Sequence, residues 1–347
     1  MKTKTISLFI ISFLIFSCTK EINIDLEVGK EQVVVEGMIH PKYPVLLSLS
    51  KTQGYFTEFS ENELMEIGIT DADVKVIRNS DKEEITLNFI AFDSASSLGI
   101  YTELDLNTLS FNPDFSRFGE SYKLQIIWNN DTITSNTTIP FVDTTNMIDS
   151  VRFVEDERFP GYGDFYFYYN DPDTMGNNIM LESKRIAHWE NGEFSPDFRF
   201  VKALWGSVRN DFEGLNGISF ESMFERGESN LFSMNDFYGE KDPNHGNFKT
   251  HHFEINEEND TVWHKADTVI IRFSQLDKAS FEFWRSIEIQ NAMNNNPFGE
   301  PQNLKSNIKG GIGIWEGKGC VYFKVFAKTD TIFKTRYKPE ITKLEFL

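Results

Sequence analysis

After residue 31, short stretches of alternating apolar and polar residues follow one another, separated by turn residues. Such alternation is typical of strands with one face in a core, and no helical period competes with it. The predicted strands are 33–39, 44–52, 72–78, 84–92, 99–104, 122–128 and 131–139. Asn129-Asn130-Asp131 predicts a tight turn, so residues 122–139 are expected to form a hairpin. The pattern predicts a β-sandwich domain of the immunoglobulin-like or transthyretin-like type over residues 31–142.

The β pattern continues beyond a connecting stretch at 140–149, and predicts a second, larger β-rich domain over residues 143–347. Its predicted strands are 150–157, 164–171, 178–189, 198–205, 230–238, 247–255, 267–276, 311–315 and 319–333. We expect the strands at 164–171 and 178–189 to form a hairpin, and the last two to be separate strands. The chain is therefore expected to be all-β.

One helix is predicted inside this second domain, over about residues 279–293. Asp277 is a suitable N-cap, and the apolar face includes Phe281, Trp284 and Ile287. The sequence Asn-Asn-Asn-Pro at 294–297 is a natural stop, since proline cannot continue a helix.

The first seventeen residues have a different pattern, with Lys2 and Lys4 followed by the apolar stretch Ile6–Phe16. Its eleven residues match the apolar part of a signal peptide and fall short of the ~20 needed to span a bilayer. Ser17-Cys18 follows directly, where a lipoprotein signal peptidase would cut. We therefore predict a signal peptide at 1–17, lipid on the thiol of Cys18, and a tether at 18–30. The alternative is an ordinary secreted protein in which Cys18 is incidental.

The residues after the cysteine resemble a sorting signal. Thr19-Lys20-Glu21 resembles the signal that directs lipoproteins of the Bacteroidota group to the outer face of the outer membrane. The expected location is thus the outer membrane, with a lipid anchor and with the folded part facing the cell exterior.

Composition narrows the range of partners. The chain has 53 acidic and 34 basic residues, a net charge of −19, which disfavours nucleic acid as a partner. It has two cysteines, so once Cys18 carries lipid, Cys320 has no disulfide partner within the chain. Because Cys320 lies in an apolar strand, we expect a buried, inert thiol.

One segment has the spacing of a calcium loop. Asp171, Asp173, Gly176 and Glu182 occupy its positions 1, 3, 6 and 12. Strands are predicted on both sides where helices belong, and Pro172 is foreign to such a loop, so a plain hairpin turn is favoured. We expect no metal and no cofactor, with Asp171, Asp173 and Glu182 as the candidate ligands if a metal binds. No nucleophile, zinc-protease or phosphate-loop motif is present, which favours a protein without catalytic residues.

The stretch 296–315, NPFGEPQNLKSNIKGGIGIW, together with CTKEINIDL and VVVEGMI near the start, resembles the domain of unknown function 4249 family. The resemblance implies a Bacteroidota outer-membrane lipoprotein that assists a TonB-dependent nutrient transporter or captures its cargo. It brings no catalytic residue. In structural terms, Asn307 is expected to hydrogen-bond loop backbone, and Gly313 to allow a tight turn before Trp315 returns to the core.

Two other functions remain open on the sequence. One is a structural or adhesive module on the cell surface. The other is a surface hydrolase that acts on glycan or peptide, because paired carboxylates are numerous enough to supply an acid and a base.

Overall fold

The computed structural model describes most of the chain from Glu31 onward. The described residues are 31–53, 66–92, 97–142, 147–155, 157, 162–189, 192, 194–196, 200–202, 208–210, 216–224, 248–249, 252–255, 260–293, 303–327 and 337–342. The predicted signal peptide and tether, with Cys18, lie outside them. The elements below belong to one compact unit, Gln32–Thr52 with Glu58–Leu347.

Seven strands between residues 33 and 138 confirm the predicted β-sandwich. They are β1 (Val33–Ile39), β2 (Leu46–Lys51), β3 (Asp73–Arg78), β4 (Glu84–Ala91), β5 (Gly99–Thr102), β6 (Ser121–Trp128) and β7 (Asp131–Thr138). Their order in the sheet is β1-β2-β5-β4-β3-β6-β7. The β6–β7 hairpin turns at Asn129 and Asn130, whose φ angles of 48° and 65° suit a two-residue turn. Their inward residues form one apolar core.

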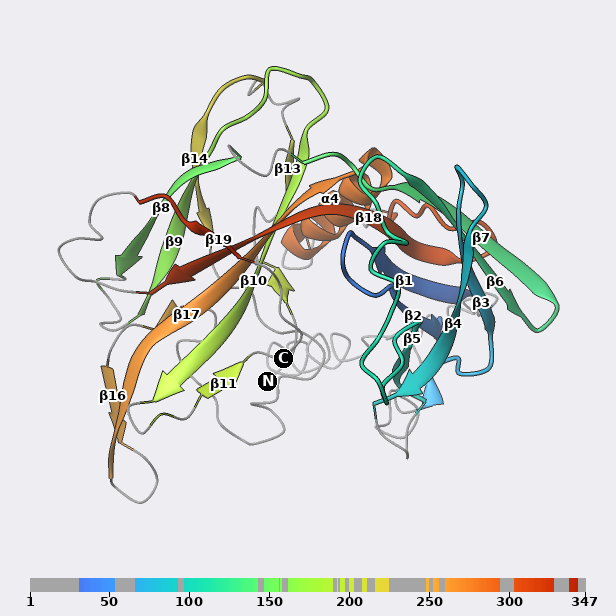
Figure 1. The fold of residues 1–347 in the computed structure, drawn as a ribbon, viewed down its shortest axis with the longest axis horizontal. Helices are drawn as coiled ribbons and strands as arrows, with labels where there is room; N and C mark the ends of the chain where they lie inside the picture. Colours follow the sequence, from blue (N-terminus) through green and yellow to red (C-terminus); the bar gives the residue numbers. More distant parts are fainter. Residues whose placement is uncertain are drawn as a thin grey trace, which may run out of the picture. The chain divides into compact units, whose positions relative to one another are not determined.

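The strand β18 (Ile312–Phe326) takes part in both halves of the fold (Figure 1). Its first half pairs with β1 in parallel, from Val34↔Ile312 to Ile39↔Gly317. Its second half pairs antiparallel with β17 (Thr261–Leu276). Trp315 of β18 is fully buried in the core of the first sandwich, while Val321, Phe323 and Val325 lie in a second core. The boundary predicted at residues 142/143 stays a prediction, and β18 contributes to the cores on both sides of it.

The two strands predicted at 311–315 and 319–333 are one strand up to Phe326, which corrects the sequence prediction. Glu316-Gly317-Lys318 resembles a turn because it is charged and contains glycine. In the structure Glu316 and Lys318 point to the same buried face, and a side chain at Gly317 would collide with the backbone of Thr138 on β7. The charged residues Glu316 and Lys318 therefore form buried polar contacts and do not mark a turn.

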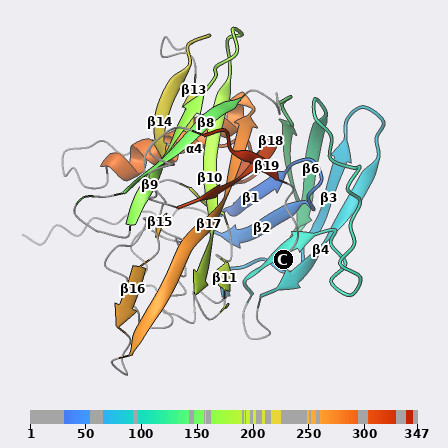
Figure 2. The same cartoon turned by 60° about the vertical axis from the view of Figure 1, so that its left-hand side comes forward.

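The second sandwich packs a four-stranded sheet against part of the large sheet (Figure 2). The small sheet contains β8 (Ile148–Glu155), β9 (Tyr162–Tyr169), β14 (Phe220–Phe224) and β15 (Phe248–Lys249). The large sheet supplies β17, β18 and β10 (Asn178–Trp189). Shorter strands complete it: β11 (Phe194–Pro196), β12 (Val201–Lys202), β13 (Val208–Asn210), β16 (His252–Ile255) and β19 (Glu340–Thr342). Aromatic residues Phe165 and Phe167 of β9 meet Phe273 of β17 in the shared core.

The predicted hairpin of 164–171 with 178–189 is wrong, because β9 and β10 belong to different sheets. Both strands place large apolar residues in the same core, and they do so from opposite layers. Residues 170–177 therefore connect two layers. Asn177 secures this connection, since its side chain accepts a hydrogen bond from Gln275 Nε2 at 2.7 Å.

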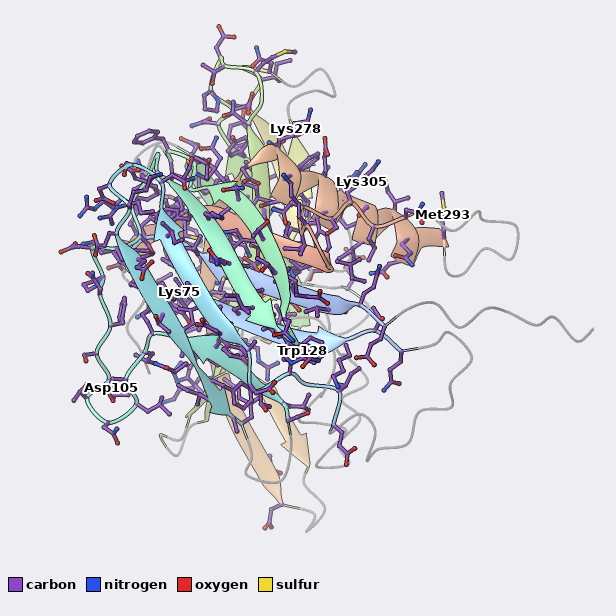
Figure 3. The ribbon with its side chains drawn as sticks, turned by 90° about the vertical axis from the view of Figure 1, so that its right-hand side faces the viewer. Lys75, Asp105, Trp128, Lys278, Met293 and Lys305 are labelled. Carbon is purple, nitrogen blue, oxygen red and sulfur yellow. The ribbon has the colours of Figure 1, made fainter. Side chains whose placement is uncertain are left out.

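The helix α4 (Lys278–Met293) agrees with the predicted helix, and Figure 3 labels its two ends. Asp277 is its N-cap, since Oδ1 accepts a hydrogen bond from the Ser280 amide at 2.8 Å. Its other oxygen, Oδ2, accepts from Thr137 Oγ1 at 2.6 Å and from the Thr138 amide at 3.3 Å. One carboxylate therefore both begins the helix and binds the first sandwich. Within the described residues, α4 is the one helix, and the all-β fold class is confirmed.

Replacing Asp277 by Ala is expected to lower the free energy of unfolding by about 2 kcal/mol, because the cap and the bonds to β7 are lost together. Asp277→Asn keeps an oxygen for the cap and should lose less than half as much. Urea unfolding of both variants measures the difference. Equal losses in the two variants would contradict the assigned cap.

Candidate functional site

Five charged residues gather on the face of the large sheet that is opposite the second core. Strand alternation directs Val269, Ile271 and Phe273 of β17 into that core, and Arg272 to the other face. We call the set the charge cluster; it consists of Glu182 on β10, Lys202 on β12, Arg272 on β17, and Glu316 and Lys318 on β18. Next to it, Phe283 and Trp284 of α4 pack on Ile314.

Four of the five side chains are almost completely removed from solvent. The exposed fractions are 2% for Glu182, 5% for Arg272, 4% for Glu316 and 1% for Lys318. Burying charges costs several kcal/mol per ion, so each needs close partners of opposite charge. The cluster therefore depends on good local geometry.

The contacts form a continuous network from β10 to α4. Arg272 donates from Nε and Nη2 to the two oxygens of Glu182, each at 2.7 Å, in a bidentate pair. Lys318 Nζ lies 3.2 Å from Glu182 Oε2 and 3.0 Å from Glu316 Oε1. Trp284 Nε1 donates to Glu316 Oε2 at 2.6 Å. Each buried carboxylate thus has a cation and a further donor.

The surrounding charges set the protonation states. Burial by itself would raise the pKa of Glu182, but the charges of Arg272 and Lys318 outweigh it and hold that pKa well below its usual range. Burial is also the main influence on Lys202, and with the charge of Lys318 it lowers the pKa of that ammonium to about 8. Lys202 Nζ lies 3.0 Å from the centroid of the Trp284 ring, a cation–π contact.

Aromatic side chains border the charge cluster next to Arg272. We call His40, Tyr43, Phe200 and Tyr322 the aromatic rim. The His40 ring stacks on Tyr43 with centroids 4.4 Å apart and lies 6.3 Å from Tyr322. The Phe200 ring lies 5.9 Å from Tyr322, and Arg272 Cζ lies 4.4 Å from the Phe200 centroid. The rim therefore adjoins the guanidinium of the cluster.

The structure places Glu182 apart from Asp171 and Asp173, the other two candidate metal ligands predicted from the sequence. Asp171 accepts a hydrogen bond from the Gly217 amide at 2.8 Å, and Asp173 accepts from Asn216 Nδ2 at 3.1 Å. Glu182 lies in the charge cluster, bound by Arg272. In the part of the chain that the structure describes, no three His, Cys, Asp or Glu side chains are grouped so as to hold a metal ion.

Cys320 lies next to the charge cluster. Its Sγ is 3.3 Å from Ser274 Oγ, and burial raises the pKa of the thiol above its usual value. A thiol in that state is a poor nucleophile. Cys18, the predicted lipid site, lies outside the described residues.

Sequence reasoning missed the charge cluster apart from Glu182, which it considered only as a metal ligand. One signal was present: in the strand at 267–276, Arg272 is a charge between Ile271 and Phe273. A cation in the middle of an apolar strand needs a buried anion on a neighbouring strand. The sequence does not say which acid supplies it.

Glu103 anchors the segment that brings His40 and Tyr43 to the rim. Its carboxylate accepts a hydrogen bond from the Val45 amide, whose nitrogen lies 2.9 Å from Oε2 and 3.2 Å from Oε1. Burial raises the pKa of Glu103 to about 7, against the opposing effect of its backbone hydrogen bonds. This group therefore titrates near neutral pH.

Because the folded pKa of Glu103 exceeds the unfolded value of 4.5, its contribution to stability is complete below pH 4.5 and is lost as pH rises through 7. Between pH 5 and pH 8, the free energy of unfolding of the wild type should fall by up to about 3 kcal/mol relative to that of Glu103→Gln. Urea unfolding of both proteins at the two pH values gives this difference. Parallel pH dependences in wild type and variant would contradict the assignment.

Two β-sandwiches that share β18, with buried charges between the sheet and α4, define an all-β protein with a polar cluster inside its scaffold. The chain belongs to the family described as "Domain of unknown function (DUF4249)", whose model matches residues 19–318. No curated protein matches the chain. Among the described residues, no helix is both long and apolar enough to cross a lipid bilayer.

Proposed function

We propose that this protein is a lipoprotein of the outer membrane, attached through Cys18 and facing the cell exterior. There it serves without catalysis, as an accessory or cargo-binding partner of a TonB-dependent nutrient transporter. The observation that carries the proposal is that the family match starts at the predicted cleavage site. The family match begins at residue 19, immediately after the cysteine at which the leader would be cut. The match thus begins where the predicted mature chain begins and covers most of it, up to residue 318.

The chemistry of the charge cluster supports binding over catalysis. A general acid or base works best with a pKa near the operating pH. Glu182 is held ionised by Arg272 and Lys318, with a pKa far below that range. The thiol of Cys320 is held protonated by burial. Charges fixed in this way suit recognition of a ligand better than proton transfer.

Isolation of the protein from its own membrane tests the proposal. An affinity-tagged chain is purified from detergent-solubilised envelopes of the host, and the proteins that accompany it are identified by mass spectrometry. We expect a TonB-dependent outer-membrane barrel in the wild-type preparation and not in the Cys18→Ala preparation. Recovery of the wild-type chain without such a barrel would contradict the partnership and favour the adhesive alternative.

A further inference from the structure

Two polar atoms at the edge of the charge cluster are buried without a hydrogen-bond partner among the described residues: His40 Nε2 and Tyr322 Oη. The residues are 1% and 8% exposed. Buried polar groups in folded proteins are nearly always paired, and an unpaired one costs about 1–3 kcal/mol. Two of them in neighbouring rings are available to a partner from outside the chain, which can be a water molecule or a ligand.

The hydrogen-bonding roles of the two groups follow from their surroundings. Burial, with the charges of Arg272 and Lys318, lowers the pKa of His40 well below its usual value, although the Pro41 bond and Glu182 oppose this. The ring is therefore neutral. Its Nδ1 lies 3.4 Å from the Pro41 carbonyl oxygen, which can only accept, so Nδ1 carries the proton and Nε2 is an acceptor. His40 Nε2 therefore requires a hydrogen-bond donor, such as a hydroxyl group.

The charge cluster has more cationic groups than carboxylates. Glu182 and Glu316 are two buried carboxylates, whereas Lys202, Arg272 and Lys318 are three cations. Lys202 forms no salt bridge among the described residues; Glu36 also acts on it, but its side chain is exposed to solvent. Arg272 uses Nε and Nη2 for Glu182, and its Nη1 has no acceptor among the described residues. An anion would complete this arrangement.

The aromatic rim and the neighbouring Lys202 have partial access to solvent, because the side chains of Tyr43, Phe200 and Lys202 are only half-buried. Phe200 and Lys202 are two positions apart on one segment, and both side chains face the cluster. Phe200 contacts Arg272, and Lys202 contacts Trp284. A small ligand would therefore meet aromatic faces, the acceptor of His40, the hydroxyl of Tyr322, and donors from Arg272 and Lys202. This combination matches a molecule with both a carboxylate and hydroxyl groups.

We propose that His40, Tyr322, Arg272 and Lys202 form a binding site for a small hydroxylated carboxylate, of the hydroxy-acid or sugar-acid class. The carboxylate pairs with Arg272 and Lys202, and a ligand hydroxyl donates to His40 Nε2. The inference rests on the cargo-binding part of the proposed function and names the class of cargo. It does not depend on the anchor or on a transporter.

Calorimetric titration of the full chain, purified in detergent, tests the site with four probes. Lactate and galacturonate carry both features, acetate lacks the hydroxyl, and glycerol lacks the charge. We expect lactate or galacturonate to bind at least about tenfold more tightly than acetate, and glycerol not to bind. Equal binding of acetate, or binding of none of the four at millimolar concentration, would overturn the proposal.

Variants separate binding from stability. Tyr322→Phe removes no hydrogen bond within the described residues, so the protein should fold, while affinity falls about tenfold. Tyr101→Phe is the matched control: its hydroxyl donates to the Ile69 carbonyl and accepts the Ala72 amide in the first sandwich. That variant should lose stability and keep affinity. Unchanged affinity in Tyr322→Phe would overturn the role of this hydroxyl and the site with it.

A pH series adds a readout that a purely structural cluster would not give. The pKa of Lys202 is lowered to about 8 by burial and by Lys318, while Glu182, Glu36 and Glu316 oppose the shift. A bound carboxylate favours the charged ammonium, so affinity should fall as pH rises above 8, and Lys202→Met should remove this dependence. Affinity that is constant from pH 7 to pH 9 would contradict the role of Lys202.

Discussion

Replacing Glu182 by Gln is expected to lower the free energy of unfolding by about 3–5 kcal/mol, the largest loss we expect from any single charge among the described residues. The substitution preserves size and removes the one carboxylate that both Arg272 and Lys318 contact. Two buried cations would then have only Glu316 to balance them. Urea unfolding, with the transition midpoint and slope compared with wild type, measures the loss.

The matched control is an exposed pair with the same chemistry. Lys75 Nζ lies 3.3 Å from Glu84 Oε1 between β3 and β4, and the side chains are 36% and 55% exposed. Glu84→Gln should change stability by less than about 1 kcal/mol, because water screens such pairs. A similar effect for Glu84→Gln and Glu182→Gln would show that burial does not decide the strength of these contacts, contrary to our account.

Gly313→Ala is expected to cost about 4 kcal/mol or more, because it opposes the pairing of β1 with β18 in two ways. Gly313 has a φ of +113°, a conformation that side chains oppose. A methyl group there would also overlap the carbonyl oxygen of Val35 on β1. To relieve the overlap, the chain must move the strand that carries Trp315. Denaturant unfolding followed by tryptophan fluorescence measures the loss.

Gly176 separates the two causes. Its φ is +103°, similar to that of Gly313, but a methyl group there would meet nothing within 4 Å. Gly176→Ala should therefore show the backbone strain alone, about 1–2 kcal/mol. If the two variants lost equal stability, strain would account for both, and the close approach of β18 to β1 would have no energetic consequence.

Local signals in the sequence were sufficient for much of the fold. The alternation of apolar and polar residues located all seven strands of the first sandwich. Asn129 and Asn130 predicted a hairpin, and Asp277 predicted the start of α4. Asn307, expected to bind loop backbone, accepts the Trp315 amide at 2.9 Å and donates to the Trp315 carbonyl at 2.7 Å. Each of these depends on residues close together in the chain.

The charge cluster depends on residues far apart in the chain. Glu182 and Arg272 are ninety positions apart and meet only because β10 and β17 are neighbours in the sheet. In sequence, Glu316 and Lys318 resemble a turn, since most charges lie at the surface. The parallel pairing of β1 with β18 is likewise non-local. Such contacts follow from tertiary packing, so alternation alone does not predict them.

The lipid on Cys18 is the claim on which the proposed function most directly depends. Intact-mass measurement of the chain isolated from host membranes tests it, together with growth on labelled palmitate. We predict a chain that begins at Cys18, carries the mass of a diacylglycerol with fatty acid, and takes up the label, whereas Cys18→Ala takes up none and leaves the membrane. An unlabelled wild-type chain, or a Cys18→Ala chain that stays equally membrane-bound, would contradict the account.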